Sequence, residues 1–413
     1  MTSQKAEALA KNPKIDFVEQ DQSINLSSDF SENNIFSKKL SFNTTSSSQI
    51  IPWGVQRVGG PLDGTGKKAW VLDTGIDLNH DDLNVDIDNS ASFIASENAD
   101  DLNGHGTYVA GILAAINNSQ DAVGVAAGAT VVSVKVLDQS GTGTITSVCN
   151  GIDHVFSNAS TNDVINMSLG KLDPDNLVSA LDNAVINSAN AGFRFTIAAG
   201  NDKTDANDVT PARVEHPNVW TVSAFREGDE FAASFDSNPN KGSNFSNPPI
   251  DFSAGGENIR SLRIGGGSGM GFGPSGSEDG TSYAAPQIAG LLLASVAGID
   301  SDGVVSGDPD GNPDPIAVKA SSSLSAVISG PSFVTTGQEG TWTVEAQGGV
   351  PPYEYDWQRN VYDPPHWEYL HDSDDSYSET VTEYFELRVE VTDATHTVIF
   401  TPVFTVATSS GSF

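Results

Sequence analysis

The chain has 413 residues, of which 38% are hydrophobic and 18% charged, and it contains 40 glycines and 20 prolines. This length excludes a single small module and indicates two or three folded units, while the composition excludes wholesale disorder. The 54 acidic residues outnumber the 20 basic ones and give a formal charge of −34. Such a chain repels phosphate backbones and anionic lipids, so we expect no nucleic-acid partner and no membrane binding.

The acidity itself has more than one explanation. The simplest is a solvated, repulsive surface, and the sharper ones are calcium binding and adaptation to salt. No apolar run approaches the length of about eighteen residues that a membrane-spanning helix needs, so we expect no membrane span.

Cys149 is the single cysteine, so no intramolecular disulfide can form. It lies in an apolar run, residues 148–152, where a thiol is more often buried filler than a nucleophile. The N-terminal residues 1–6 lack the apolar core of a signal peptide, so either export uses a segment that this sequence does not contain, or the protein stays inside the cell.

The chain divides by pattern into four parts. Residues 1–47 are polar and Ser/Asn-rich after a short helical stretch, residues 6–11, and a strand-like run, residues 15–19. From residue 48 to 299, short β-branched runs alternate with helix-like stretches, which indicates βαβ units and a mostly parallel sheet. The predicted strands are 69–72, 130–136, 164–167, 193–198 and 219–223, and the predicted helices are 106–115, 145–156, 177–191 and 282–297.

The remaining parts change in period. Residues 300–319 are dense in Asp, Gly and Pro, which predicts a loop or linker. From residue 320 to 413, short strands and turns predict a small β-sandwich, with strands at 341–344, 353–357, 385–391 and 398–406. The stretch 348–357 resembles the polycystic-kidney-disease (PKD) and related immunoglobulin-like modules of secreted bacterial hydrolases. Its aromatic residues could form a sugar-binding strip, but alternating aromatics are more often sandwich core. These aromatic residues are Trp342, Tyr353, Tyr355 and Trp357.

Three segments of the first large unit supply the groups that serine-based peptide hydrolysis needs: an acid, a base and a nucleophile. Asp73 ends the buried run 69–72, at the carboxyl end of a strand, where parallel-sheet sites usually lie. His105 stands between two glycines at the start of a predicted helix. Ser282 begins another helix, where small neighbours leave its hydroxyl open and backbone N–H groups face an anion.

These segments resemble the Asp, His and Ser boxes of the subtilisin superfamily, and they follow its chain order. The resemblance implies a three-layer α/β/α sandwich with a mostly parallel sheet, and an acyl-enzyme on Ser282. It also implies that Asn201, in the segment 198–201, is the side-chain donor of the oxyanion hole. The substrate would lie as an added strand between two cleft edges. The edges implied are Gly141, Thr142 and Gly143 on one side and Ser168, Leu169 and Gly170 on the other.

The predicted function is therefore hydrolysis of internal peptide bonds of protein substrates by a secreted, monomeric serine endopeptidase, without an organic cofactor. Four residues depart from the pattern common among relatives and bear on cleft preference: Tyr108, Lys171, Asp279 and Gln287. The alternative is a catalytically silent scaffold whose C-terminal domain binds a surface, a polysaccharide or a protein. The histidines at 80, 154 and 216 lack the Gly-His-Gly-Thr frame of His105 and are not candidates for the base.

The N-terminal part is expected to be a prosegment that the enzyme removes itself. Residues 15–21 resemble the final strand of the subtilisin propeptide, and residues 49–55 resemble the start of the mature enzyme. The cut is therefore expected between about Gln22 and Ser48. Only the end of a full inhibitor domain is present in this sequence.

The resemblance further implies structural calcium at two sites. Residues 105–124 are similar, without a gap, to the subtilisins that carry a tight calcium loop, and calcium prefers a mixed set of six to eight oxygens. The ligands implied at the first site are the carbonyls of Ile116, Gln120 and Ala122 and the side chains of Gln49, Asp82 and Asn118. A second site, similar to one in the proteinase K group, would use the carbonyls of Pro217 and Val219 with the carboxylate of Asp251. The simpler alternative is that 117–119 form only a polar turn.

Overall fold

The computed structural model describes residues 18–26, 48–236, 238–272, 279–320, 323–349, 353–362, 365–370, 373–393 and 397–409. The chain forms two compact units, Met1–Lys319 and Ala320–Phe413. The helical stretch expected at 6–11 and the first three residues of the expected strand 15–19 lie outside the described residues. No helix in the described part of the chain is long and apolar enough to cross a membrane.

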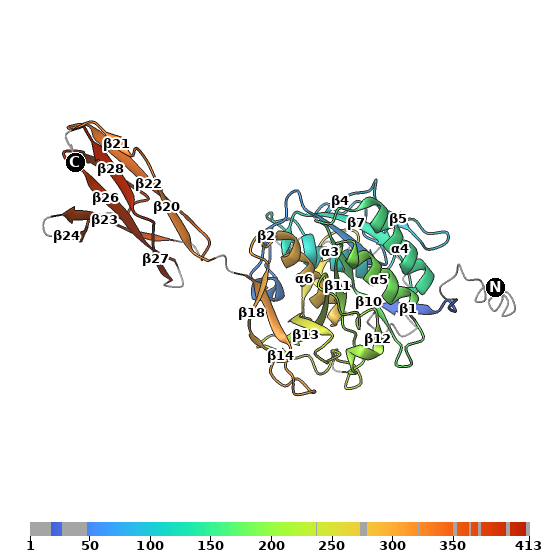
Figure 1. Ribbon diagram of the computed structural model, residues 1–413. Helices are drawn as coiled ribbons and strands as arrows, with labels where there is room; N and C mark the ends of the chain where they lie inside the picture. The colour runs from blue at the N-terminus through green and yellow to red at the C-terminus, as the bar shows by residue number, and fades with distance from the viewer. Residues whose placement is uncertain are drawn as a thin grey trace. The chain divides into compact units, whose positions relative to one another are not determined.

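The first unit is built on an 11-stranded sheet, most of whose strands run parallel (Figure 1). In spatial order its main strands are β18 (Ile299–Val304), β19 (Pro315–Lys319), β15 (Ile250–Gly255), β13 (Val219–Arg226), β11 (Arg194–Ala198), β9 (Val164–Met167), β3 (Lys68–Asp73), β7 (Thr130–Lys135) and β4 (Asn84–Val85). Two short strands join off this path, β14 (Glu230–Phe231) on β13 and β5 (Ala91–Ser92) on β7.

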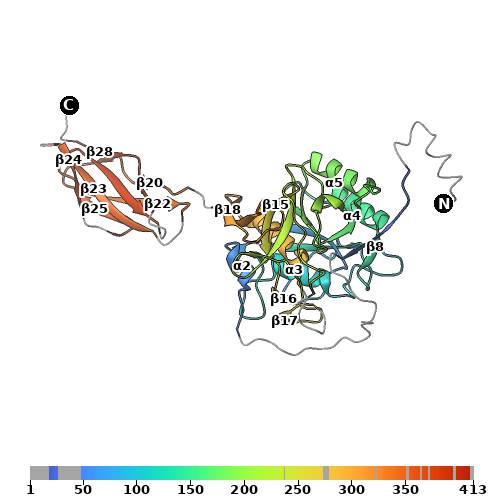
Figure 2. The same cartoon turned by 90° about the horizontal axis from the view of Figure 1, so that it is seen from below.

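Helices cover both faces of this sheet, which is why its strands are apolar on both sides. On β3, Trp70 and Leu72 face a core that includes α4 (Ile145–Asn158) and α5 (Ala180–Asn190). Ala69 and Val71 face the opposite core, which includes α3 (His105–Ala114) and α6 (Thr281–Ala294). Figure 2 shows α4 and α5 on one side of the sheet and α3 on the other. The predicted three-layer α/β/α sandwich is confirmed.

Smaller elements surround the sheet. A four-stranded antiparallel sheet contains β12 (Val209–Thr210), β10 (Leu169–Leu172), β1 (Ser23–Leu26) and β8 (Thr142–Thr144), in that order. Two further pairs are β16 (Arg260–Leu262) with β17 (Ser268–Met270), and β2 (Leu62–Asp63) with β6 (Ala126–Ala127). The remaining helices are α2 (Trp53–Arg57) and the 3-10 turn η1 (Ala206–Asp208).

The expectation that residues 300–319 form a linker is wrong. β18 and β19 pair with each other, and β19 also pairs in parallel with β15 at Ser253 and Ile316. Ile316 and Ala317 are buried in the first unit, so hydrophobic burial fixes this segment to the sheet. The Asp- and Gly-rich composition extends through β18 and the turn that follows it, whereas β19 is mostly apolar.

The second unit is strand-rich, as a β-sandwich requires. Its three-stranded sheet is β20 (Ser325–Ser329), β22 (Glu339–Gln347) and β25 (Ser376–Thr380). Its six-stranded sheet contains β21 (Phe333–Val334), β28 (Phe404–Thr408), β26 (Phe385–Thr392), β23 (Glu354–Tyr362), β24 (Pro365–Tyr369) and β27 (Val398–Phe400). Trp342 and Trp357 are fully buried and share one core, so the core interpretation of these two aromatics is confirmed.

Candidate active site

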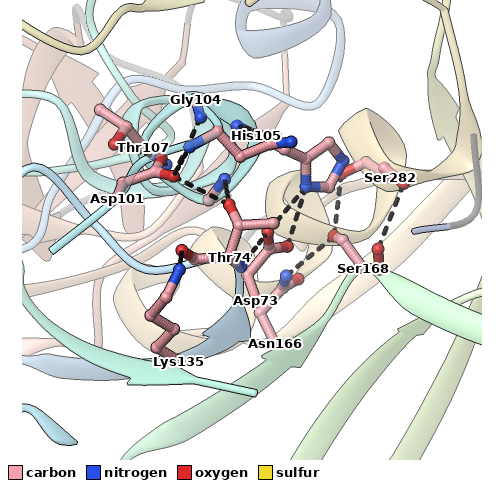
Figure 3. Close-up of polar contacts among 12 residues, drawn as sticks. Asp73, Thr74, Asp101, Gly104, His105, Thr107, Lys135, Asn166, Ser168 and Ser282 are labelled. Atoms are coloured by element: carbon pink, nitrogen blue, oxygen red, sulfur yellow. Dashed lines mark hydrogen bonds and ion pairs between the residues drawn. The ribbon is translucent and has the colours of Figure 1, made fainter. Parts of the chain in front are cut away.

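Asp73 and His105 meet where β3 ends and α3 begins. His105 Nδ1 lies 2.8 Å from Asp73 Oδ1 and 3.0 Å from Oδ2, and both side chains are buried. The carboxylate therefore fixes the orientation of the ring, and Figure 3 shows the ring between Asp73 and Ser282. The other ring nitrogen, His105 Nε2, is buried without a hydrogen-bond partner among the described residues. It is the atom that a base would use.

Close approach of helix α3 to strand β3 depends on Gly106. A Cβ at this position would lie 2.0 Å from the carbonyl oxygen of Gly75 and 3.2 Å from Cβ of Asp73. The first distance is far below any real contact, so a side chain here would push the helix away from the strand. Glycine beside His105 thus permits the short Asp73–His105 distance.

Ser282 lies in the first turn of α6 and is bonded to Ser168, at the edge of the cleft. Ser282 Oγ donates to the carbonyl oxygen of Ser168 at 3.4 Å, and Ser168 Oγ donates to the carbonyl oxygen of Ser282 at 2.9 Å (Figure 3). Asn166, a polar residue inside the buried strand β9, donates to Ser168 Oγ at 3.0 Å. Sequence reasoning missed Asn166, although an amide side chain in the middle of an apolar run indicates a buried polar residue that needs a hydrogen-bond partner.

The amide group of Asn201 has a fixed orientation. Its Oδ1 accepts hydrogen bonds from the backbone N–H and the hydroxyl of Thr281, both at 2.9 Å. Thr281 immediately precedes Ser282, and a Cβ on Gly280 would lie 3.0 Å from Asn201 Nδ2. The structure thus places Asn201 against the start of α6, with its NH₂ group near Gly280.

Asp101 is a buried carboxylate that connects the Asp and His segments, and sequence reasoning missed it. Asp101 Oδ1 accepts from Thr74 Oγ1 at 3.0 Å, from Asn103 N at 3.0 Å and from Gly104 N at 2.9 Å. Oδ2 accepts from the backbone N–H and the hydroxyl of Thr107, at 2.9 and 2.7 Å. Because these donors belong to the end of β3 and the start of α3, Asp101 holds the two segments together (Figure 3).

Lys135 lies beneath the same site and was also missed. Its side chain is fully buried, pairs with Glu97 at 3.0 Å, and donates to the carbonyl oxygen of Thr74. Thr74 is therefore held from both sides, by Lys135 at its carbonyl and by Asp101 at its hydroxyl. A lysine at the end of a buried strand is the sequence signal for such a pair.

The two predicted cleft edges flank a strand of the chain itself. β1 runs antiparallel between β8 and β10: Asn25 lies opposite Thr142 on one side and Gly170 on the other. Leu26 pairs with Leu169, and its N–H donates to the carbonyl oxygen of Gly141 at 3.0 Å. Leu169 precedes Gly170 and follows Ser168, the residue that contacts Ser282. The strand occupies the cleft in the way an extended peptide would.

Two acidic residues just before β1 cap two helices. Glu19 Oε2 accepts from the N–H of Ser179 at 2.8 Å and of Ala180 at 3.2 Å, at the start of α5. Asp21 Oδ1 accepts from the N–H of Thr146 at 3.0 Å, in the first turn of α4. Carboxylates satisfy the free N–H groups of helix starts and interact well with the helix dipole. These contacts add to those of β1 in holding the segment on the first unit.

The strand expected at residues 15–19 lies mostly outside the described residues, and the strand that the structure describes in this part, β1, comes after it. The structure places a strand at Ser23–Leu26, whereas Val18 and Glu19, the described residues of the predicted run, precede it. Pairing decides this position, because the edges β8 and β10 are complementary to residues 23–26. Most of the expected cut interval lies outside the described residues.

Three of the four residues that depart from the pattern of the family form hydrogen bonds around the site. The Tyr108 hydroxyl donates to the carbonyl of Gly269 at 3.0 Å and accepts from the N–H of Gly271 at 2.7 Å, next to the β16–β17 pair. The Asp279 carboxylate accepts from Asn258 N at 2.8 Å. Gln287 is buried and donates to the carbonyls of Gly255 and Tyr283. Lys171 lies on β10 opposite Thr210.

Cys149 and the histidines at 80, 154 and 216 stand outside this site. Burial raises the pKa of the Cys149 thiol to about 11, so it is protonated at neutral pH. His80 bonds to the N–H of Asp82, His154 to the carbonyl of Asn89, and His216 to the N–H of Asn218.

The residues expected at the first calcium site converge on one point. The Gln49 amide group lies 2.8 Å from the carbonyl oxygen of Ile116, 3.3 Å from that of Gln120 and 3.5 Å from Asn118 Oδ1. Asp82 Oδ1 accepts from the Asn118 amide at 2.5 Å, and its Oδ2 is buried without a partner among the described residues. Ala122 bridges to Ile50, next to Gln49. The oxygens gathered around Gln49 Nε2, with an unsatisfied buried carboxylate bonded to Asn118, are of the mixed kind that calcium prefers.

The residues of the second expected site are neighbours on the sheet. Asp251 lies on β15, and its carboxylate accepts from the N–H of Thr221 on β13 at 2.9 Å. Thr221 follows Val219 by two residues and Pro217 by four. Among the described residues, the second site shows neither the gathered oxygens nor the unsatisfied carboxylate that the first calcium site has.

Comparisons with known proteins agree with this geometry. Residues 64–304 match the model of the subtilase family, peptidase S8. Subtilisin-like protease 1 of Arthroderma gypseum is 33% identical over 316 residues, which cover 72% of this chain and 56% of that protein. M-protease of Shouchella clausii is 34% identical over 301 residues, covering 70% of this chain and 66% of that protein.

A solved structure gives the same result. The crystal structure of a cold adapted subtilisin-like serine proteinase is 30% identical, with a TM-score of 0.52, and the match covers 67% of this chain and 100% of that one. The chain belongs to the subtilase family. It spans about 56% of the length of the Arthroderma gypseum relative.

Proposed function

We propose that the protein is a serine endopeptidase that hydrolyses internal peptide bonds of protein substrates. The observation that carries this proposal is the buried Asp73–His105 pair at 2.8 Å, with Ser282 at a helix start beside it. Family membership supports the same function. In this reaction Ser282 Oγ attacks the scissile carbonyl, and His105 Nε2 accepts the hydroxyl proton and then passes it to the leaving amine.

The chain's other groups serve the same reaction. Asp73 keeps the proton of the neutral ring on Nδ1, so that Nε2 is the basic nitrogen, and it stabilises the imidazolium that forms. The Asn201 amide and the Ser282 backbone N–H are the proposed donors to the oxyanion, and losing one such donor typically costs about 10²–10³ in turnover. Backbone pairing with β8 and β10 would bind extended peptides of many sequences.

Cleavage of a peptide library by the purified chain and by Ser282→Ala tests this function. We expect cleavage by the first and none by the second, since the variant retains the cleft but has no nucleophile. Equal cleavage by both would overturn the mechanism. No cleavage by either, with peptides still bound in the cleft, would favour the silent scaffold. The buried Asp73–His105 pair and the fixed Asn201 amide argue against that alternative, because a chain that no longer catalyses the reaction has no reason to keep them.

We also propose that residues 1–47 are a prosegment that the enzyme removes, with the cut shortly after Leu26. Three observations support this: β1 fills the cleft, Leu26 pairs one residue from Ser168, and Glu19 and Asp21 cap two helices of the first unit. Mass spectrometry of the N-terminus should find a shortened chain in the active protein and an intact one in Ser282→Ala. The same N-terminus in both would defeat this proposal.

Structural calcium is proposed at both sites. Gln49, Asp82 and Asn118 and the carbonyls of Ile116, Gln120 and Ala122 would hold the first ion, joining residue 49 to the end of the helix that carries His105. The ion would supply positive charge to the buried Asp82 carboxylate and rigidity to the loop. It takes no part in the chemical step.

The second unit and the location of the protein complete the proposal. We propose that residues 320–413 are a PKD- or immunoglobulin-like domain that binds a surface, a polysaccharide or a protein, and that the protein acts outside the cell as a monomer. The strand-rich fold and the excess of acidic residues support this. Sedimentation of the full chain with insoluble polysaccharides and proteins, compared with a chain ending at Lys319, tests the binding role.

A further inference from the structure

Phe272 stands against the histidine of the site. Its ring centroid lies 5.2 Å from that of His105, and the two rings are nearly perpendicular, at 86°. A Cβ on Gly104 would lie 3.3 Å from Phe272 Cδ2, so the phenyl ring also packs on the backbone just before His105. Perpendicular aromatic rings at this separation attract one another. The phenyl ring therefore borders the imidazole that must transfer protons.

Tyr108 holds the segment that carries Phe272. Its hydroxyl donates to the carbonyl of Gly269 at 3.0 Å and accepts from the N–H of Gly271 at 2.7 Å. The rings of Tyr108 and Phe272 are also neighbours, with centroids 6.2 Å apart. Because Tyr108 lies on α3 one turn after His105, a single helix carries the histidine and fixes the position of its aromatic neighbour.

Phe272 and β1 contact different parts of the site. Among the described residues that line the hollow beside β1, none belongs to the segment 268–272. β1 runs toward Ser168, whose carbonyl oxygen accepts from Ser282 Oγ. A peptide that continues in the direction of β1 therefore passes Ser282 and leaves the two cleft edges. The half of a substrate that follows the scissile bond lies in that direction.

We propose that Phe272 selects the substrate residue that follows the scissile bond and favours an apolar or aromatic side chain there, with Tyr108 as its positioning residue. This inference rests on the proposed function. His105 Nε2 gives its proton to the leaving amine, which requires about 2.6–3.2 Å between the two nitrogens. The residue that carries the amine is therefore a neighbour of the imidazole ring, which Phe272 borders. An apolar side chain there gains contact with the phenyl ring, whereas glycine gains none.

Acyl transfer to amino-acid amides isolates this contact, because an added amine takes the position of the leaving amine. Its nitrogen attacks the acyl carbon of the Ser282 ester, His105 Nε2 accepts the amine proton, and Ser282 Oγ leaves with that proton. The experiment uses the protein expressed from the full chain and a peptide methyl ester as acyl donor. Phenylalanine amide and glycine amide compete as the added amines. The ratio of the two transfer products does not depend on how much of the enzyme is folded.

We expect the parent to prefer phenylalanine amide and Phe272→Ala to reduce this preference at least about tenfold, the lower end of the discrimination that one methylene gives in an apolar pocket. Phe272→Tyr keeps the ring and should retain the preference. Tyr108→Phe should reduce it, because Gly269 and Gly271 lose a hydrogen-bond partner. The control Phe156→Ala removes a phenyl ring that is 50% exposed on α4, on the other face of the sheet, and should leave the ratio unchanged.

No preference in the parent, or an equal preference in the parent and Phe272→Ala, would overturn the proposal. An unchanged ratio in Tyr108→Phe would overturn its positioning role. These results are read only after an acyl-enzyme has formed, so they are distinct from a failure of the proposed function. A parent that hydrolyses no ester would contradict that function and, with it, this inference.

Discussion

The Asp101 carboxylate binds one residue of the helix that carries His105: the N–H and the hydroxyl of Thr107 both donate to Asp101 Oδ2. The other carboxylate oxygen binds Thr74, the residue after Asp73. The separation of Asp73 and His105 therefore depends on a group that touches neither the substrate nor the reacting atoms.

We predict that Asp101→Asn lowers kcat by about 10- to 100-fold with little change in KM, the effect expected of a small displacement of a catalytic group. An amide has one acceptor oxygen, so the donors that face its NH₂ group lose their partner. Steady-state kinetics check this, with Thr107→Ser, which keeps the hydroxyl, and Thr107→Val, which does not. Wild-type kcat in Asp101→Asn, or equal kinetics in the two Thr107 variants, would contradict the positioning role.

A second prediction concerns the strand in the cleft. Ile24 is fully buried in the first unit, whereas its neighbour Asn25 is exposed. Ile24→Asp would place a carboxylate in an apolar environment at a cost of several kcal/mol, so we expect N-terminal processing at least about tenfold slower. Asn25→Asp adds the same charge at the exposed position and should process at nearly the normal rate. Intact-mass time courses after refolding measure both, and a normal rate for Ile24→Asp would argue against a substrate-like role for β1.

The first calcium site gives a third prediction. A ligand that binds only the folded chain at a hundredfold excess over its dissociation constant adds roughly 2.7 kcal/mol to the free energy of unfolding. Thermal inactivation should therefore be slower in millimolar calcium than in chelator. Asp82→Ala should lose much of this difference. If Asp82→Ala responds to calcium just as the wild type does, Asp82 is not a ligand.

A fourth prediction uses pH. Glu257 is partly buried, and this burial raises the pKa of its carboxyl group to about 7. The negative charges of Asp279, Glu230 and Asp236 act in the same direction, and Arg226 opposes them. Between about pH 4.5 and 7 the folded chain keeps a proton that the unfolded chain has lost. Ionisation of Glu257 in this window therefore lowers the free energy of unfolding as the pH rises.

Glu257→Gln removes this effect. In the Ser282→Ala chain at constant calcium, its thermal midpoint should exceed that of the parent at pH 8 and match it at pH 5. Glu227→Gln, at an exposed position of the same region, is the control and should differ little from the parent at either pH. A midpoint difference for Glu257→Gln that is the same at both pH values would show that packing, not ionisation, causes it.

Local pattern predicted the elements that carry Asp73, His105 and Ser282, because each polar residue follows or opens a strongly apolar run. The start of α5 was placed three residues too early, at 177 instead of Ala180. The reason is a local side-chain bond: the Asp173 carboxylate accepts the N–H of Leu177 and of Val178 and keeps them out of the helix. Such bonds do not appear in hydrophobic periodicity.

Other parts of the site could not be predicted because their contacts join residues far apart in the sequence. Asp101 joins Thr74 across 27 residues and Lys135 joins it across 61, so the local sequence does not identify the partner of either side chain. The prediction of a linker at residues 300–319 was wrong for a different reason. Its turn dominates the composition, whereas the two strands that fix it to the sheet contribute only a few buried residues, among them Ile316 and Ala317.

The position of β1 between β8 and β10 has a kinetic consequence. A strand covalently attached to its own binding site competes with external peptides at an effective concentration on the order of millimolar for a short flexible connection, whatever the enzyme's own dilution. Cutting that connection would turn the competition into an ordinary bimolecular one, which weakens as the solution is diluted. Onset of activity would then depend on where the protein is released, slow in a crowded compartment and fast once it diffuses away.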